Sequence, residues 1–207
     1  MRWAYPVSSE MIRGNAMIFI VRHGQTELNT AHVLQGRSNH PLNDAGIAQA
    51  RATAQALAER GISFSHVFSS PLVRAVQTAE ILAPGVAVQL DERLIEMDYG
   101  PYEGADLTNP APEIVTFFSD FVHNPAPKGM EQLAQVVART GAFVEEVKGL
   151  PSNILVSTHA IAMKGILEYL TPSSQGAYWS TYIGNCAVYV AECRGGMVGV
   201  PEELVLR

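Results

Sequence analysis

Two short apolar runs constrain the fold of this 207-residue chain more than any other feature of its sequence. They cover residues 17–21 and 153–157, and neither alternates with polar residues, which predicts strands buried on both faces. Each run is followed closely by a histidine, His23 after the first and His159 after the second. Because function in open α/β sheets gathers beyond the carboxyl ends of the strands, both histidines are candidate site residues.

Helical and strand patterns alternate along the rest of the chain. Further helices are expected over residues 43–61, 70–82, 131–147 and 161–170, and further strands over residues 66–69, 86–90, 186–192 and 203–206. This alternation predicts an α/β fold, a three-layer sandwich with a mostly parallel sheet flanked by helices.

The domain organisation follows from where these patterns stop. Residues 98–128 are punctuated by Pro and Gly, with one helical stretch at 113–122, and are expected to form a small cap excursion. Residues 1–16 lack the apolar stretch of a signal peptide and are expected to be an N-terminal extension of a domain over residues 17–207.

Composition excludes several functions. The chain has 14 Lys+Arg against 20 Asp+Glu, a net charge of −6, which argues against nucleic-acid and anionic-membrane partners. No apolar run approaches the ~20 residues that span a bilayer.

Cys186 and Cys193 are expected on opposite faces of one strand, so we expect reduced thiols and a cytoplasmic protein. The histidines lack metal-ligand spacing, and neither a metal nor a cofactor is expected.

Arginines accompany the two histidines. Arg22 directly precedes His23, and Arg74 lies in the first turns of the helix expected after Ser70-Pro71. Guanidinium groups donate paired hydrogen bonds to phosphate oxygens, and N–H groups at a helix N-terminus bind anions. Two guanidiniums, two imidazoles and a helix N-terminus therefore indicate a site for a dianionic phosphoryl group.

The motifs taken together resemble those of the histidine phosphatase superfamily, in the branch (branch 1) that contains the cofactor-dependent phosphoglycerate mutases. The resemblance covers about residues 18–189, most of the chain. The matching stretches are VRHGQTELN at 21–29, QGR at 35–37, PLNDAG at 41–46, SSPLVRAVQTA at 69–79, LIE at 94–96, YGPYEG at 99–104 and VSTH at 156–159.

This resemblance implies roles for five candidate catalytic residues. His23 matches the nucleophile that becomes phosphohistidine, a role that suits neutral imidazole near pH 7. Arg22, Arg74 and His159 match groups that hold the phosphoryl oxygens and stabilise the transition state. Glu96 matches the proton donor to the leaving oxygen.

Other positions carry weaker expectations. Asp98 and Glu103 are nearby alternatives to Glu96, although Glu103 is expected to be structural. Asn29, Gln35, Gly36 and Ala160 match positions that touch phosphate or substrate. Ala160 stands where the family commonly has Gly, which keeps the backbone N–H group but narrows the pocket, and Lys164 stands where Arg is frequent.

Three functions are open on the sequence. One is hydrolysis of a small phosphorylated metabolite, in which water attacks the phosphohistidine; another is a phosphoglycerate mutase; the third is a catalytically idle relative that binds phosphorylated ligands or partner proteins. The mutases of the family carry a long basic insertion where this chain has residues 105–128, whose one Lys or Arg is Lys128. Hydrolysis is therefore favoured, and the presence of all five candidate catalytic residues disfavours the idle relative. The oligomeric state is open, with a dimer as one option.

Overall fold

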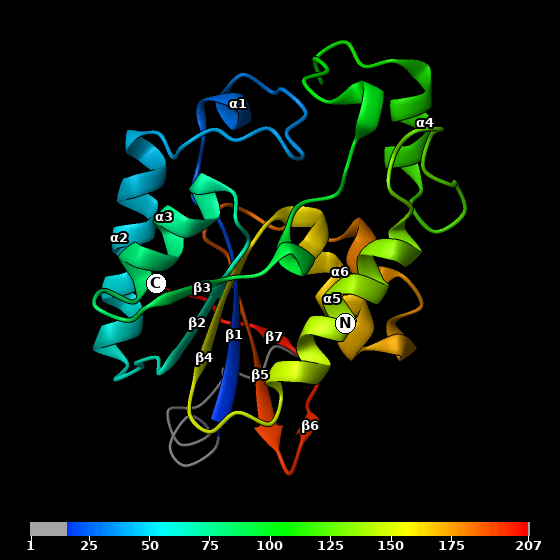
Figure 1. The fold of residues 1–207 in the computed structure, drawn as a ribbon. Coiled ribbons are helices and arrows are strands. Elements are labelled where there is room, and N and C mark those ends of the chain that lie inside the picture. Colours follow the sequence, from blue (N-terminus) through cyan, green and yellow to red (C-terminus); the bar gives the residue numbers. More distant parts are fainter. Residues whose placement is uncertain (1–15, 207) are drawn as a thin grey trace.

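A seven-stranded sheet runs through the middle of the described chain (Figure 1). The computed structural model describes residues 16–206. The strands are β1 (Ala16–Arg22), β2 (His66–Ser69), β3 (Val88–Leu90), β4 (Ile154–Thr158), β5 (Val188–Arg194), β6 (Met197–Val198) and β7 (Glu202–Glu203), in the order β3-β2-β4-β1-β5-β6 with β7 paired to β5. Strands β3, β2, β4 and β1 are parallel, whereas β5 to β7 pair antiparallel, which gives the mixed, mostly parallel sheet that the sequence predicted.

The register between β1 and β4 determines where the two histidines lie. Arg22 pairs with Thr158 at the carboxyl ends of the two strands, so both strands end at the same level. The N–H group of His23 then donates to the carbonyl oxygen of Thr158 at 2.9 Å. His23 and His159 consequently leave the sheet next to each other.

Helices cover both faces of the sheet, which confirms the three-layer sandwich (Figure 1). One face of β1, with Phe19 and Val21, packs against α2 (Asp44–Glu59) and α3 (Val73–Leu82). The opposite face, with Ile18 and Ile20, packs against α5 (Leu133–Val147) and α6 (Ala160–Leu170). Each face of β1 is thus buried, as expected for a central parallel strand.

A cap lies over the carboxyl ends of the strands. The regular elements of the cap itself, within residues 98–128, are η2 (Gly100–Tyr102) and α4 (Pro112–Ser119). Outside the cap, the other short elements are α1 (Glu27–Thr30), η1 (Glu92–Leu94), η3 (Pro172–Ser174) and η4 (Ala177–Ser180). The cap has its own apolar cluster, in which Ile114 and Phe117 of α4 pack against Met97, Tyr99 and Trp179. Phe117 is therefore a core residue of the cap.

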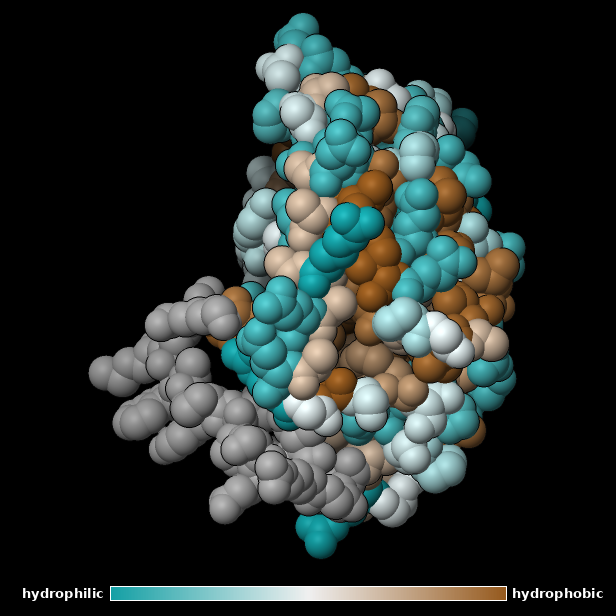
Figure 2. All heavy atoms as spheres, turned by 90° about the vertical axis from the view of Figure 1, so that its left-hand side faces the viewer, coloured by the Kyte–Doolittle hydropathy of each residue, from teal (hydrophilic) through white to brown (hydrophobic). Residues whose placement is uncertain are grey.

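The outer face of α2 and α3 is viewed in Figure 2, where apolar side chains show between rows of hydrophilic ones. A hollow there is lined by Leu57 near the end of α2, Ile81 near the end of α3, and Phe64 from the segment between α2 and β2. Among residues 16–206, no helix is both long and apolar enough to cross a membrane.

The structure corrects some of the expected boundaries. Cys186 is not on a strand: it precedes β5 with a φ of +56°, and its N–H group donates to the carbonyl oxygen of Arg22. Pro71 is not in the first turn of α3, because Leu72 is the N-cap of that helix. The expected strand at residues 203–206 is the two-residue β7 at 202–203, and β6 was not expected. Ala16 is the first residue of β1, and the rest of the expected N-terminal extension, residues 1–15, lies outside the described residues.

Candidate active site

His23 follows the last residue of β1 and is 3% exposed. Its Nδ1 atom lies 2.7 Å from the carbonyl oxygen of Gly24, an acceptor, so Nδ1 carries the ring proton. Burial, with the charges of Arg74 and Arg22 as further causes, lowers the pKa of His23 well below its ordinary 6.5. The ring is therefore neutral at pH 7, and Nε2 keeps a lone pair for attack on an electrophile.

Arg74, near the start of α3, is fully buried and contacts that lone pair. Its Nε donates to Nε2 of His23 at 3.3 Å, while Nη1 and Nη2 donate to the carbonyl oxygens of Ser38 (2.7 Å) and Gly36 (2.6 Å). Burial lowers the pKa of Arg74 to about 10, so the group is charged at pH 7. A guanidinium has five N–H groups, and two of these five are left for an incoming anion.

His159 is the N-cap of α6, and its ring centroid lies 5.1 Å from that of His23. Its Nε2 is 2.7 Å from Oγ of Ser70, which also accepts from the N–H group of Leu72. If the Ser70 hydroxyl donates its proton to Nε2, the ring proton of His159 is on Nδ1. Burial and then the charge of Arg74 lower the pKa of His159 well below 6.5, so this ring is neutral as well.

Several buried polar atoms of the site have no hydrogen-bond partner among the described residues. They are Nε of Arg22, Nε2 of Gln35, Oγ of Ser38 and Nδ1 of His159. Unpaired buried polar groups are rare in folded proteins, and each costs about 1–3 kcal/mol. All four can donate a hydrogen bond, the His159 ring in the tautomer given above. An oxyanion bound between His23 and Arg74 would supply the missing acceptors.

Arg22 is the last residue of β1, and one terminal nitrogen of its guanidinium group contacts the segment before β5. Its Nη1 donates to the carbonyl oxygen of Ile183 at 2.6 Å. Burial lowers the pKa of Arg22, while the nearby Glu96 is the largest of the opposing influences. The structure thus brings Arg22, His23, Arg74 and His159 together at the carboxyl ends of β1 and β4.

Glu96 joins this group from the segment after η1. It is 3% exposed, and its carboxylate oxygens accept from the N–H groups of Met97 (2.8 Å), Ala162 (3.0 Å) and Ile161 (3.1 Å). Two of these donors belong to the first turn of α6, directly after His159. The N–H group of Ala160 is the one in that turn that Glu96 does not occupy.

The two alternatives to Glu96 are engaged elsewhere. Glu103 accepts hydrogen bonds from three successive N–H groups, those of residues 36, 37 and 38, which confirms the structural role expected for it. Asp98 forms an ion pair with Arg37 at 3.2 Å and accepts from the N–H group of Gly100. Glu96 is therefore the acidic group that lies within the buried site.

The expected substrate-binding positions differ in what they offer. Both backbone groups of Gly36 are occupied, since its N–H donates to Glu103 and its carbonyl accepts from Arg74, so Gly36 has no free N–H for a substrate. Asn29 belongs to the capping box of α1, and its Oδ1 also accepts from Asn185. Gln35 accepts from Thr26 through Oε1, and its buried amide nitrogen is unpaired.

Tyr99 and Lys164 lie near the site, and neither of them was given a role from the sequence. Tyr99 is 4% exposed, and its pKa is raised by burial and then by the negative charges of Glu96 and Glu103. Lys164 of α6 donates to the carbonyl oxygen of Trp179 at 2.7 Å and lies 5.4 Å from the ring of Phe121. Burial lowers the pKa of Lys164 to about 8. Tyr99 follows Glu96 in a recognised motif, which could have identified it, whereas Lys164 gave no signal beyond replacing an Arg.

No group of three or more His, Cys, Asp or Glu side chains among residues 16–206 is arranged to hold a metal ion. Arg22, Arg74 and His159 lie around His23 at the carboxyl edge of the sheet.

The chain belongs to the histidine phosphatase superfamily (branch 1), whose sequence pattern it matches over residues 18–201. It is 31% identical over 179 residues to the Yersinia pestis protein named "Probable phosphoglycerate mutase GpmB", covering 83% of this chain and 82% of that one.

Solved structures agree with this assignment. The phosphoserine phosphatase of Entamoeba histolytica in complex with 3-phosphoglyceric acid superposes with a TM-score of 0.75 at 25% identity, covering 93% of this chain and 96% of that one. The mycobacterial glucosyl-3-phosphoglycerate phosphatase in complex with VO3 gives a TM-score of 0.78 at 25% identity, covering 91% of this chain and 96% of that one.

Proposed function

We propose that this protein hydrolyses a small phosphomonoester through a phosphohistidine intermediate. The observation that carries the proposal is the neutral ring of His23, whose Nε2 lone pair accepts from Arg74, while the neighbouring Arg22 and His159 each keep an unpaired buried ring or guanidinium nitrogen. A catalytically idle phosphate-binding protein would need the donors but not a nucleophile in this tautomer.

In the first step, Nε2 of His23 attacks phosphorus and the bond to the leaving oxygen breaks. Arg22, Arg74 and His159 bind the non-bridging oxygens, whose charge they stabilise in the transition state. Glu96 gives a proton to the leaving oxygen, so the product departs as a neutral alcohol.

In the second step, water attacks the phosphohistidine and the N–P bond breaks. Glu96, now a carboxylate, takes the proton from that water, which returns both Glu96 and Nε2 of His23 to their starting states. The products are inorganic phosphate and the free alcohol, so no redox partner or cofactor is consumed.

Hydrolysis is favoured over mutase chemistry because the cap has few positively charged side chains. A phosphoglycerate mutase must hold a carboxylate and a second phosphate while excluding water, and residues 105–128 supply Lys128 as their one Lys or Arg. Mutase activity is kept as the second candidate because of the 31% identity to the Yersinia protein. The bound 3-phosphoglyceric acid of the Entamoeba relative supports a small phosphorylated metabolite as substrate.

The two candidates are separated by their products. The purified protein is given 3-phosphoglycerate with and without 2,3-bisphosphoglycerate, beside a panel of other phosphomonoesters, and phosphorus NMR follows the reaction. We expect inorganic phosphate from one or more monoesters and no isomerisation. Rapid formation of 2-phosphoglycerate with little free phosphate would establish the mutase instead.

A further inference from the structure

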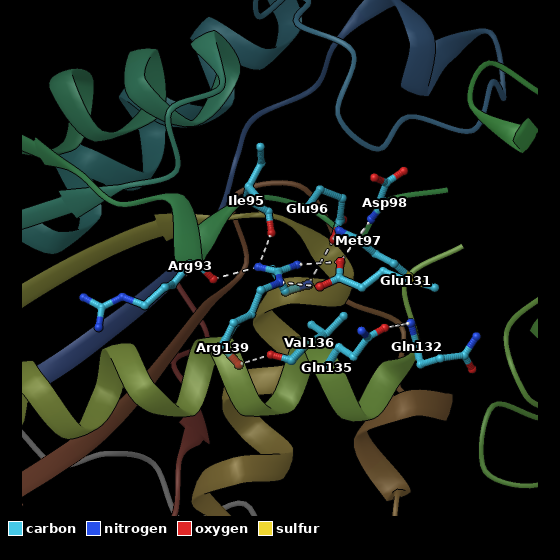
Figure 3. Close-up of polar contacts among 12 residues, drawn as sticks. Arg93, Ile95, Glu96, Met97, Asp98, Glu131, Gln132, Gln135, Val136 and Arg139 are labelled. Atoms are coloured by element: carbon cyan, nitrogen blue, oxygen red, sulfur yellow. Dashed lines mark hydrogen bonds and ion pairs between the residues drawn. The ribbon is translucent and has the colours of Figure 1, made fainter. Parts of the chain in front are cut away.

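A partly buried ion pair lies beside the segment that carries Glu96 (Figure 3). Nε of Arg139, on α5, is 2.7 Å from Oε1 of Glu131, and its Nη2 is 3.1 Å from Oε2. The two side chains are 17% and 10% exposed. This paired geometry fixes both groups more tightly than a single contact would.

The same two side chains hold the backbone on both sides of Glu96. Arg139 donates through Nη1 to the carbonyl oxygens of Arg93 (2.7 Å) and Ile95 (2.6 Å), which precede Glu96. Glu131 accepts from the N–H group of Asp98 (3.1 Å), and its own N–H group donates to the carbonyl oxygen of Asp98 (2.8 Å), beyond Glu96. In Figure 3 these contacts enclose the turn from which Glu96 projects.

Glu131 also connects this segment with the loop that holds Arg74. Arg37 reaches Oδ2 of Asp98 at 3.2 Å and Oε2 of Glu131 at 3.5 Å. The neighbours of Arg37 in that loop are Gly36 and Ser38, whose carbonyl oxygens accept from Arg74. The ion pair is thus in contact with the supports of both the proton donor and the phosphate-binding arginine.

Glu96 needs such support because residues 95–98 belong to no regular helix or strand. A proton donor must come within about 2.6–3.2 Å of the oxygen that it protonates, and a displacement of 1 Å can cost about 100-fold in rate. We propose that the Glu131–Arg139 pair is a positioning unit that sets the place of the Glu96 carboxyl for proton transfer to the leaving group. This inference rests on the proposed role of Glu96 as general acid.

The test compares leaving groups, since a poor one needs its oxygen protonated and p-nitrophenolate does not. Arg139→Gln removes both carbonyl contacts, and Glu131→Gln disrupts the paired geometry at similar shape. For each variant we expect kcat/KM on an alkyl phosphate to fall by roughly 10- to 100-fold, and kcat/KM on p-nitrophenyl phosphate to change less than about threefold. The comparison uses kcat/KM because this quantity excludes the later hydrolysis of the phosphohistidine, in which Glu96 also takes part. Adding Arg139→Gln to Glu96→Gln should cost little more than Glu96→Gln alone, because the two act on one step.

Arg93→Gln is the matched control. The Arg93 side chain also links this segment to α5, through Glu146 at 2.8 Å, but leaves the backbone contacts to Arg139 in place. Arg93→Gln should lower kcat/KM only slightly, and by the same factor on both substrates. Melting temperatures are measured for all variants, and Arg139→Lys replaces Arg139→Gln if the latter does not fold.

The outcomes distinguish a wrong assignment of Glu96 as general acid from a wrong assignment of the Glu131–Arg139 pair as its positioning unit. If Glu96→Gln lowers kcat/KM equally on both substrates, Glu96 is not the acid, and the positioning proposal falls with it. If Glu96→Gln is selective but Arg139→Gln and Glu131→Gln are not, or if their losses multiply with that of Glu96→Gln, the positioning proposal alone is wrong.

Discussion

The ring of His23 is both the proposed nucleophile and a neighbour of positive charge. Its tautomer is set by one short contact, from Nδ1 to the carbonyl oxygen of Gly24 at 2.7 Å. That contact directs Nε2 toward Arg74, and the positive charge there disfavours a proton on the ring. The proposed nucleophile and the arginine proposed to bind phosphate are therefore in contact before any substrate binds.

We expect His23 to carry a phosphoryl group during turnover. A rapid acid or base quench with labelled substrate should trap an adduct that is stable in base and labile in acid, as a phosphorus–nitrogen bond is. His23→Ala should lose the adduct and nearly all turnover, because no other described nucleophile is held in the same position. Near-normal turnover by this variant would contradict the assignment.

The charge of Arg74 should be visible in the titration of His23. Burial and the charges of Arg74 and Arg22 all lower the pKa of His23, so removing one charge should raise it. Arg74→Gln is thus expected to move the NMR titration of the His23 ring to higher pH, and Arg74→Lys, which keeps the charge, to move it less. An unchanged midpoint in Arg74→Gln would show that the charge of Arg74 does not contribute to the lowered pKa of His23.

Site residues that directly follow a recognisable strand could be predicted from the sequence. Contacts between distant segments that carry no such pattern could not. His23 and His159 follow strands whose apolar runs are plain in the sequence, so their place at the sheet edge was predictable. Arg139 has the pattern of an ordinary polar residue on an amphipathic helix. Only the packing of α5 against residues 93–98 gives it partners.

At the scale of elements, the start of α2 packs closely against the turn that follows β1. A Cβ atom on Gly46 would come within 2.1 Å of the carbonyl oxygen of Gln25, and one on Gly24 would come within 2.5 Å of the carbonyl oxygen of Gly46. This contact is between backbones, so no flexible side chain can move aside. It explains why the PLNDAG stretch recognised in the sequence ends in a glycine.

Gly46→Ala should therefore both destabilise the protein and disturb the turn that carries His23. We expect a loss of about 1–3 kcal/mol in the free energy of unfolding, the usual cost of overpacking, together with a fall in kcat. Gly149→Ala is the control, because a Cβ atom there meets nothing within 4 Å. Chemical denaturation and initial rates measure the two effects, and equal behaviour of the two variants would contradict the packing argument.

Element types were predictable from periodicity, but short edge elements and exact ends were not. Strands β1 and β4 are buried on both faces and gave continuous apolar runs. In contrast, β6 and β7 are two residues each, on the antiparallel side of the sheet, too short for any pattern to appear. Cys186 continued the apolar pattern of β5, yet its positive φ belongs to a turn, which hydropathy does not reveal.

At the scale of the whole molecule, the burial of two neutral histidines makes folding sensitive to mild acid. The folded-state pKa values of His23 and His159 both lie well below 6.5, the ordinary value in an unfolded chain. Below about pH 6.5 the unfolded chain therefore binds protons that the folded protein does not. As the pH is lowered, the free energy of unfolding must therefore decrease, by up to about 1.4 kcal/mol per pH unit for each histidine, until the pH reaches the folded-state pKa.

His159→Asn should reduce this slope, because asparagine does not titrate. We expect the free energy of unfolding of the wild type to decline between about pH 6.5 and 5, and the decline in the variant to be roughly half as steep. Carboxylates whose pKa is lowered, such as Asp91 and Glu145, lose their contribution only below their ordinary values of 3.8 and 4.5, so they do not enter this window. Urea denaturation at each pH, in a buffer without phosphate or sulfate that could bind the site, measures the slopes. Equal slopes in the two proteins would show that His159 takes up a proton in the folded state near its ordinary pKa, which would contradict the buried, neutral ring of the structure.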